Sequence, residues 1–131
     1  KYKPKVIVFY AGENDIASKK TPQQVFEDYK TFVELVRRHL PQTTIIFLSI
    51  KPNPERWRLW PLMQQTNALV AAFSAEQEKL IYVDIASSLL GSNGQPRPEL
   101  FLEDRLHLNE AGFQVVSETL RPYLREALTD D

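Results

Sequence analysis

Three apolar stretches limit the folds open to this chain more than any other feature. They are Val6–Tyr10, Thr44–Ile50 and Leu80–Ile85, each rich in β-branched and aromatic residues and none cleanly alternating between polar and apolar positions. Strands of this kind are covered on both faces, which is typical of a parallel sheet between two layers of helices. The pattern therefore predicts an α/β domain with three layers, α/β/α, around a parallel sheet.

Helical patterns separate these strands. Thr21, Pro22 and Gln24 have the spacing of a capping box with proline in the first turn, and Pro41 is expected to stop this helix. A second helix is predicted from about Pro61 to Phe73. The resulting order of alternating strands and helices favours parallel pairing.

A third helix is predicted to begin at Asn109, a favourable N-cap residue. Its buried side is expected to carry Phe113, Val116, Leu120 and Leu124. Pro122 is expected to kink this helix or to restart it as a separate turn. No linker or repeat interrupts the pattern, so residues 1–131 are interpreted as a single domain.

Three strands make a small sheet, because comparable doubly wound domains have about five or six. We therefore expect the domain to be incomplete at its N-terminus. An uncharged first strand left open is a hazard that natural domains avoid. The expected partner of Val6–Tyr10 is the missing N-terminal segment or another chain.

Composition excludes several classes of function. The net charge of −1 comes from 16 basic and 17 acidic residues that are mixed along the chain, which argues against nucleic acid as a partner. The absence of cysteine excludes disulfides and thiolate chemistry, and with only two histidines we expect no metal. No apolar run is long enough for a transmembrane segment. The cellular compartment stays undetermined.

Polar residues follow each predicted strand. Gly12–Asp15 come after the first, Lys51–Asn53 after the second, and Asp104 and His107 in the long connection after the third. In parallel α/β sheets, ligands bind beyond the carboxyl ends of the strands. The sequence therefore predicts that these groups meet at one rim.

Asp104 and His107 are three residues apart, just before a helix. A carboxylate at this spacing can accept a hydrogen bond from the imidazole Nδ1–H, which leaves Nε2 free to take a proton from a hydroxyl. Asn14 follows Gly12 in a segment where its amide could donate to an oxyanion. Taken singly, the first pair is more typical of a surface or packing histidine, and the second segment is more typical of an ordinary turn.

Together these motifs resemble the SGNH/GDSL hydrolase family, which has a flavodoxin-like fold. Gly12-Glu13-Asn14-Asp15 is similar to its third conserved block and Asp104-Arg105-Leu106-His107 to its fifth. The resemblance implies a serine ester or acyl hydrolase that acts on a small ester or acylated substrate without a cofactor. It also implies that His107 is the general base, that Asp104 orients it, and that Asn14 belongs to the oxyanion hole.

The first and second blocks of that family, which carry the nucleophilic serine and an oxyanion glycine, have no counterpart here. None of the serines follows Gly-Asp, and Ser49 is expected to pack inside its strand. We therefore expect the nucleophile upstream of residue 1 and no turnover by residues 1–131 alone. The alternative is a non-catalytic or degenerate binding module. A nucleotide binder lacks support, because no glycine-rich loop follows a strand.

Gly12, Trp57 and Trp60 are candidates for a substrate pocket. Asn53 could cap a short helix that places the two indoles at i and i+3. They would then form an aromatic wall for the acyl or alcohol group, or cover the core. The sequence leaves both interpretations open.

Overall fold

The computed structural model describes residues 3–129 and contains one parallel sheet with the strand order β1-β2-β3. The strands are β1 (Val6–Phe9), β2 (Thr44–Leu48) and β3 (Leu80–Val83). In the register, Val6 lies opposite Thr44 and Ile45 opposite Leu80. All three predicted strands are confirmed as parallel strands of one sheet.

The strands end earlier than predicted. Beyond β2, the backbone N–H and C=O of Ile50 bond to the side chain of Asn67 rather than to a neighbouring strand. Beyond β3, the N–H of Ile85 donates to the hydroxyl of Ser49. Side chains thus satisfy backbone groups where the chain leaves the sheet after β2 and β3, so the apolar runs can be longer than the ladder.

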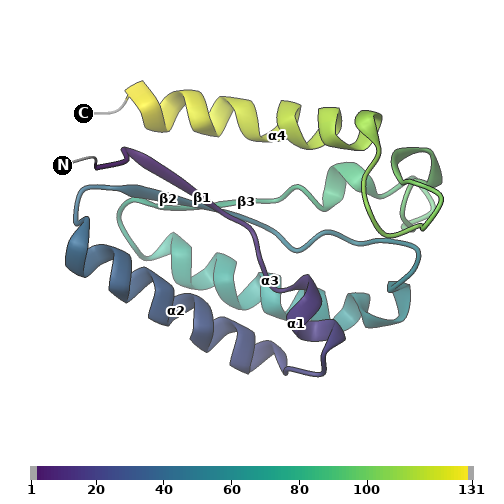
Figure 1. Ribbon diagram of the computed structural model, residues 1–131, viewed down its shortest axis with the longest axis horizontal. Coiled ribbons are helices and arrows are strands. Elements are labelled where there is room, and N and C mark those ends of the chain that lie inside the picture. Colours follow the sequence, from purple (N-terminus) through teal and green to yellow (C-terminus); the bar gives the residue numbers. More distant parts are fainter. Residues whose placement is uncertain (1–2, 130–131) are drawn as a thin grey trace.

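Helices cover both faces of the sheet, as Figure 1 shows, which confirms the three-layer α/β/α class. The α-helices are α1 (Glu13–Ala17), α2 (Pro22–His39), α3 (Trp60–Ala75) and α4 (Glu110–Thr129). Short 3₁₀ helices span Trp57–Leu59, Ser87–Leu89 and Pro98–Leu100. Helices α2 and α3 lie on one face and α4 on the other. No helix within residues 3–129 is long and apolar enough to cross a membrane.

Helix α2 begins as predicted. The Thr21 hydroxyl accepts the N–H of Gln24, and the Gln24 side chain accepts the N–H of Thr21. These reciprocal bonds satisfy two backbone donors that a helix start leaves free. The predicted capping box is confirmed.

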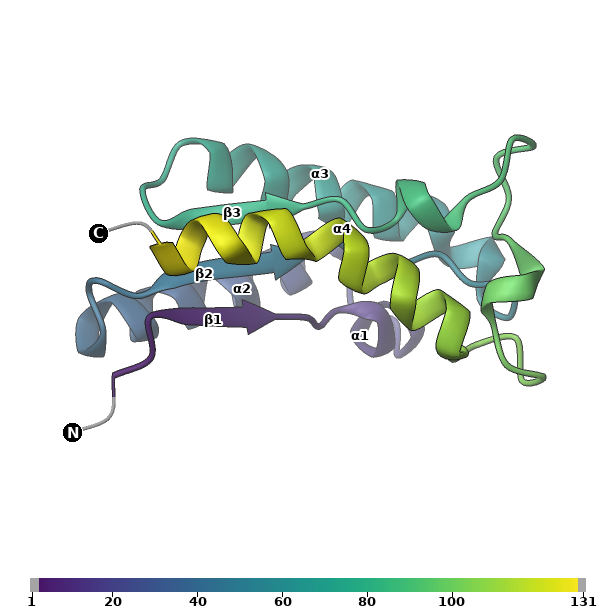
Figure 2. The same cartoon turned by 90° about the horizontal axis from the view of Figure 1, so that it is seen from above.

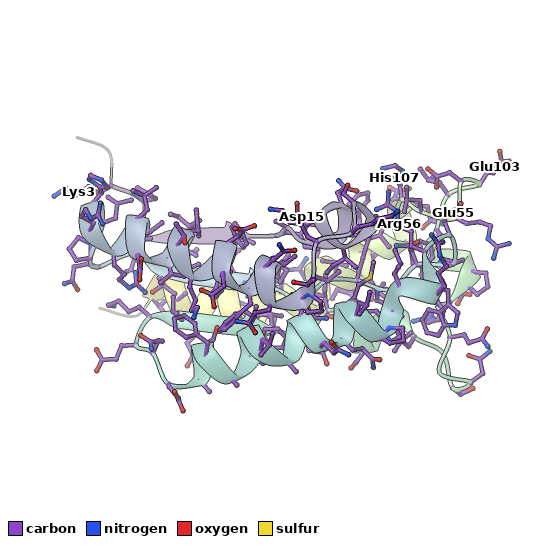
Figure 3. All side chains as sticks on the ribbon, turned by 90° about the horizontal axis from the view of Figure 1, so that it is seen from below. Lys3, Asp15, Glu55, Arg56, Glu103 and His107 are labelled. Atoms are coloured by element: carbon purple, nitrogen blue, oxygen red, sulfur yellow. The ribbon has the colours of Figure 1, made fainter. Side chains whose placement is uncertain are left out.

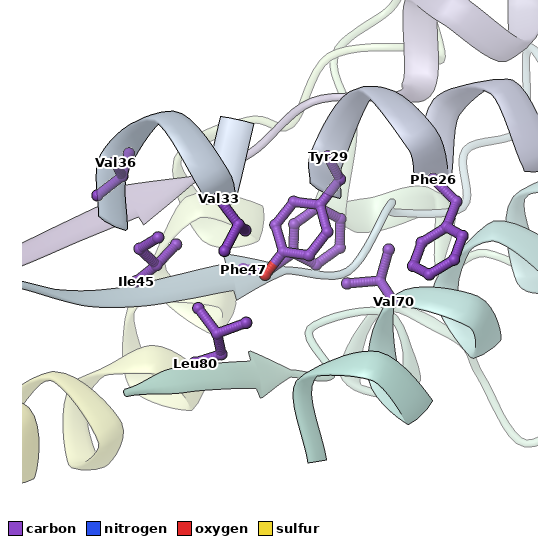
Figure 4. Packing of buried hydrophobic residues seen from close by; sticks show 8 residues of the cluster. All are labelled: Phe26, Tyr29, Val33, Val36, Ile45, Phe47, Val70 and Leu80. Carbon is purple, nitrogen blue, oxygen red and sulfur yellow. The ribbon is translucent and has the colours of Figure 1, made fainter. Parts of the chain in front are cut away.

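The larger apolar cluster lies between the sheet and the α2–α3 layer (Figure 4). Its buried members are Phe26, Tyr29, Val33 and Val36 of α2, Ile45 and Phe47 of β2, Val70 of α3 and Leu80 of β3. A second cluster joins β2 and β3 to Val116, Leu120, Leu124 and Ala127 of α4. The sheet is therefore held from both sides, which is why its strands lack alternation.

Helix α4 agrees with expectation at its start and in its course and departs from it at one residue. Asn109 accepts the N–H of Gly112 as predicted. The helix continues through Pro122, and its axis changes direction between its two halves, which is the kink, one of the two outcomes predicted for this proline (Figure 2). Phe113, predicted to be buried, is 60% exposed. The first turns of α4 extend past the ends of the strands, so helical periodicity continues where no sheet lies beneath it.

Strand β1 is an edge of the sheet. Among the described residues it pairs only with β2, and Val8 on this strand is 42% exposed. Figure 2 shows β1 on the outer side of the sheet. The open edge predicted for Val6–Tyr10 is present in this part of the chain.

Candidate active site

The polar groups predicted to meet at the carboxyl ends of the strands lie at one end of the molecule. They belong to three segments, namely Gly12–Asp15 after β1, Lys51–Asn53 after β2 and Leu102–His107 after β3. Figure 3 shows Arg56 and His107 toward this end and Lys3 at the opposite end. The parallel topology explains this, because every strand points its carboxyl end the same way.

Asp104 holds His107 through both of its carboxylate oxygens. Oδ2 lies 2.7 Å from Nδ1 of His107, and Oδ1 accepts the backbone N–H groups of Leu106 and His107 at 2.9 and 3.0 Å. The bond to the imidazole, followed by these backbone bonds, lowers the pKa of Asp104 to about 2. The carboxylate is therefore ionised at neutral pH and favours a proton on Nδ1, which leaves Nε2 as the acceptor.

The loop that carries this pair is closed on itself. The N–H of Leu102 donates to the carbonyl of His107 at 2.8 Å, and the N–H of Arg105 donates to the carbonyl of Leu102. Arg105 adopts the left-handed conformation, with φ 60°, which is unusual for a residue with a side chain. Its carbonyl accepts the N–H of Glu55 at 3.0 Å, so the loop is anchored to the segment that follows β2.

The Gly12–Asp15 segment is the start of a helix rather than the turn that its composition also allowed. Gly12 is the residue before α1 and has φ 116°, a conformation that L side chains rarely adopt. Its carbonyl accepts the N–H of Ile16, which is buried against α2 and α3. Asn14 is thereby placed in the first turn of α1.

Glu13 lies beside Asn14 and is only 8% exposed. Its Oε1 accepts from the Tyr10 hydroxyl at 3.0 Å and from Lys51 Nζ at 2.7 Å. Its Oε2 accepts from Asn53 Nδ2 at 3.0 Å and from Arg56 Nη1 at 3.4 Å. Two cations thus balance the Glu13 charge, so it does not oppose an anion in the site.

Glu13 and the groups around it influence one another's protonation and orientation. Burial, followed by the neighbouring Glu13 carboxylate, raises the pKa of the Tyr10 hydroxyl well above its ordinary value, so Tyr10 acts as a neutral donor. Asn53 also accepts the backbone N–H of Arg56 through Oδ1 at 2.8 Å. The start of α1 and the segment after β2 are therefore joined by a buried polar network.

One cavity of about 450 Å³ is lined by both halves of the site. Its walls are formed by Tyr10, Ala11, Gly12, Glu13, Asn14, Asp15, Lys51, Leu106 and His107. The fold thus brings Gly12, Asn14 and His107 to the same cavity. An acceptor on the imidazole and an amide donor facing one cavity can together assist attack on a carbonyl group.

The structure does not bring the two tryptophans to this cavity. Trp60 is 8% exposed and packs in the core with Ile16 and Met63. Trp57 stacks on Trp60, with ring centroids 6.1 Å apart, and lines a separate cavity of about 320 Å³. The segment after Asn53 is a turn and a 3₁₀ helix rather than the short helix that Asn53 was expected to cap.

No serine lines the cavity shared by Asn14 and His107 in the described part of the chain. Ser49 is fully buried, and its hydroxyl accepts the backbone N–H groups of Ile85 and Ala86 at 2.9 and 3.2 Å. Ser49 is therefore buried as expected, but it lies just beyond the end of β2 and bonds to the backbone there. Between residues 3 and 129, no group of three or more His, Asp or Glu side chains is arranged to hold a metal ion.

Sequence reasoning missed Tyr10, Leu106 and the role of Arg56 in the network. The available signal was position, since Lys51 and Arg56 both follow β2 and therefore reach the same rim. A carboxylate as buried as Glu13 requires such partners. The partners of Glu13 that follow β2 lie 38 to 43 positions further along the chain, so local sequence patterns do not reveal these contacts.

Known proteins of similar sequence and structure include esterases. Platelet-activating factor acetylhydrolase IB subunit alpha1 of Rattus norvegicus is 28% identical over 135 aligned positions, which cover 98% of this chain and 55% of the rat protein. A structure from Streptococcus pneumoniae, named for platelet-activating factor, has a TM-score of 0.82 and 27% identity over 91% of this chain and 59% of that one. A carbohydrate esterase family 3 protein from Talaromyces cellulolyticus has a TM-score of 0.80 at 17% identity, covering 98% of this chain and 60% of that one.

The chain spans 55–60% of the length of these relatives. The similarity to the Talaromyces cellulolyticus structure, at 17% identity, shows only that the two share a fold. Residues 1–115, most of the chain, match the GDSL-like lipase/acylhydrolase family. The chain therefore belongs to the GDSL-like lipase/acylhydrolase family.

Proposed function

We propose that this chain supplies the general base, its orienting carboxylate and one oxyanion donor of a serine ester hydrolase. The observation that carries the proposal is the 2.7 Å hydrogen bond between Asp104 Oδ2 and His107 Nδ1, at a cavity that Asn14 also lines. Membership of an acylhydrolase family supports it. The whole protein would act on a small ester or acylated substrate.

In this mechanism each residue has one role. Asp104 keeps the proton on Nδ1, and Nε2 of His107 takes the proton of a serine hydroxyl as its oxygen attacks the ester carbonyl. Asn14 Nδ2 donates to the oxyanion that forms. His107 then protonates the departing alcohol and activates the water that cleaves the acyl-enzyme.

The nucleophilic serine of this proposal lies outside residues 1–131. Two observations support it, namely that no serine in the described residues lines the cavity and that Ser49 is buried and bonded to the backbone. The name of the rat relative includes an acetylhydrolase activity, so an acetyl ester is the first substrate to test. The same lack of a serine favours the second candidate, a binding module without catalysis.

The test uses the full-length gene product and a fluorophosphonate probe, which reacts covalently with an activated serine. We expect the probe to label one serine outside residues 1–131, and His107→Ala to abolish both labelling and hydrolysis of p-nitrophenyl acetate. His39→Ala is the matched control, because His39 is the other histidine and lies exposed at the end of α2. It should leave both signals unchanged.

Three results would contradict the proposal in different ways. Full activity of His107→Ala would remove the general base from the mechanism. A folded wild-type protein with neither labelling nor turnover would instead favour the binding module. Labelling of a serine within residues 1–131 would show that the nucleophile was misplaced.

A further inference from the structure

Arg56 bonds to the side chain of Asn14. Its Nη1 donates to Asn14 Oδ1 at 2.9 Å and also lies 3.4 Å from Glu13 Oε2. An asparagine amide has an accepting side and a donating side, and only the accepting side can receive a guanidinium N–H. The bond therefore determines which side of the Asn14 amide is left for a ligand.

The opposite amide orientation is excluded by the same contact. If the amide of Asn14 were turned over, its NH₂ group would face the NH groups of Arg56, and two donors would meet without an acceptor. Within the described residues, Asn14 Nδ2 donates to no protein group. The donor that an oxyanion needs is thus left free while the acceptor is occupied.

Arg56 is itself held in place at both ends. Asn53 Oδ1 accepts its backbone N–H at 2.8 Å, and Glu13 lies against its guanidinium group. Glu13 is in turn fixed by Lys51, Tyr10 and Asn53. The rigid fork of an arginine can serve two acceptors at once, which a lysine ammonium does less well.

We propose that Arg56 is a positioning residue that fixes the amide of Asn14 with its N–H groups available to the oxyanion. This proposal rests on the proposed function of Asn14. Arg56 does not line the cavity, so it acts through Asn14 rather than on the substrate. Arg56 therefore contributes to stabilisation of the transition state, in which the oxyanion forms.

The experiment measures hydrolysis of p-nitrophenyl acetate by the full-length gene product. Removal of one oxyanion donor typically lowers kcat about 100- to 1,000-fold, and a donor that is only misoriented loses part of this. We expect Arg56→Gln to lower kcat roughly 10- to 100-fold with KM little changed. Arg56→Lys keeps the charge beside Glu13 and should recover part of the loss. Arg58→Gln, at an exposed arginine two residues along, is the matched control.

A double-mutant cycle separates positioning from a purely structural role. In the Asn14→Ala background, Arg56→Gln should have no further effect on kcat, because the amide it positions is absent. An equal loss of kcat with and without Asn14 would overturn the proposal. The proposal would also be overturned if the loss of kcat in Arg56→Gln and Arg56→Lys were proportional to the fall in their melting temperatures.

Side-chain amide NMR of the full-length gene product distinguishes this proposal from the proposed function. The Asn14 NH₂ resonances should shift and broaden in Arg56→Gln but stay unchanged in Arg58→Gln. If the wild type hydrolyses no ester, the proposed function fails, while the NMR result still decides whether Arg56 fixes the amide. Unchanged resonances in Arg56→Gln would refute the positioning role whatever the activity.

Discussion

Replacement of Gly12 by alanine should be among the most damaging single-methyl changes in this protein. Gly12 has φ 116°, and a Cβ added there would lie 2.8 Å from Cδ1 of Ile50, a fully buried side chain. The backbone strain costs about 1–2 kcal/mol and the overpacking about 1–3 kcal/mol. The lower entropy of the unfolded chain returns about 0.4–1 kcal/mol. We therefore expect the free energy of unfolding to fall by about 1–5 kcal/mol.

Gly94→Ala is the matched control, because it shares the strain but not the collision. Gly94 has φ 79°, and a Cβ there would meet nothing within 4 Å. It should cost about 1 kcal/mol. Urea unfolding of the full-length gene product, followed by circular dichroism, measures both changes.

Ile50→Val provides the second arm, since it removes the Cδ1 atom that the new methyl group would strike. Alone it should cost about 0.5–1.5 kcal/mol. Combined with Gly12→Ala, it should cost less than the sum of the two single changes by about 1 kcal/mol or more. The reasoning is refuted if Gly12→Ala is no more destabilising than Gly94→Ala, or if the double variant is simply additive.

Two further predictions concern Asp104 and Ser49. The pKa of Asp104 is lowered on folding from 3.8 to about 2, so its contribution to stability is complete above about pH 4 and is lost as the pH falls toward 2. The stability advantage of the wild type over Asp104→Asn in urea unfolding should therefore shrink between pH 4 and pH 2, and a constant difference would contradict this. Ser49→Ala should lower the free energy of unfolding by about 1–3 kcal/mol, because two buried N–H groups lose their acceptor. The Ser49→Ala variant should hydrolyse ester at an unchanged rate per folded molecule. A loss of this hydrolysis would identify Ser49 as part of the chemistry.

Features governed by short-range rules could be predicted from the sequence. The strands follow from unbroken apolar runs, and the start of α2 follows from the spacing of Thr21 and Gln24. Phe113 shows where such rules fail. Its position on the apolar stripe of α4 predicts burial, but the stripe does not record that the helix runs past the sheet. Helical period reports which residues share a face, and the tertiary structure decides whether that face is covered.

Trp60 shows the converse case. A large aromatic residue at the rim of a sheet is compatible with a ligand wall or with the core, and nothing local separates the two. The structure places it in the core because α1, α2 and α3 meet there, with Ile16, Val25 and Met63 around the indole. The position of α1 is part of this arrangement, and the sequence of α1 was also consistent with a turn.

The two halves of the candidate site depend on the fold to different extents, and this explains which of them could be predicted. Asp104 and His107 are three residues apart and exposed, with His107 69% accessible, so their geometry needs little beyond a closed loop. Asn14 is oriented by Arg56, 42 positions away, through a network centred on a buried carboxylate. That half exists only once β1 and β2 are paired and both segments reach the same rim. The Asp104–His107 pair is therefore a local motif, whereas the position of Asn14, the proposed oxyanion donor, is a product of the sheet.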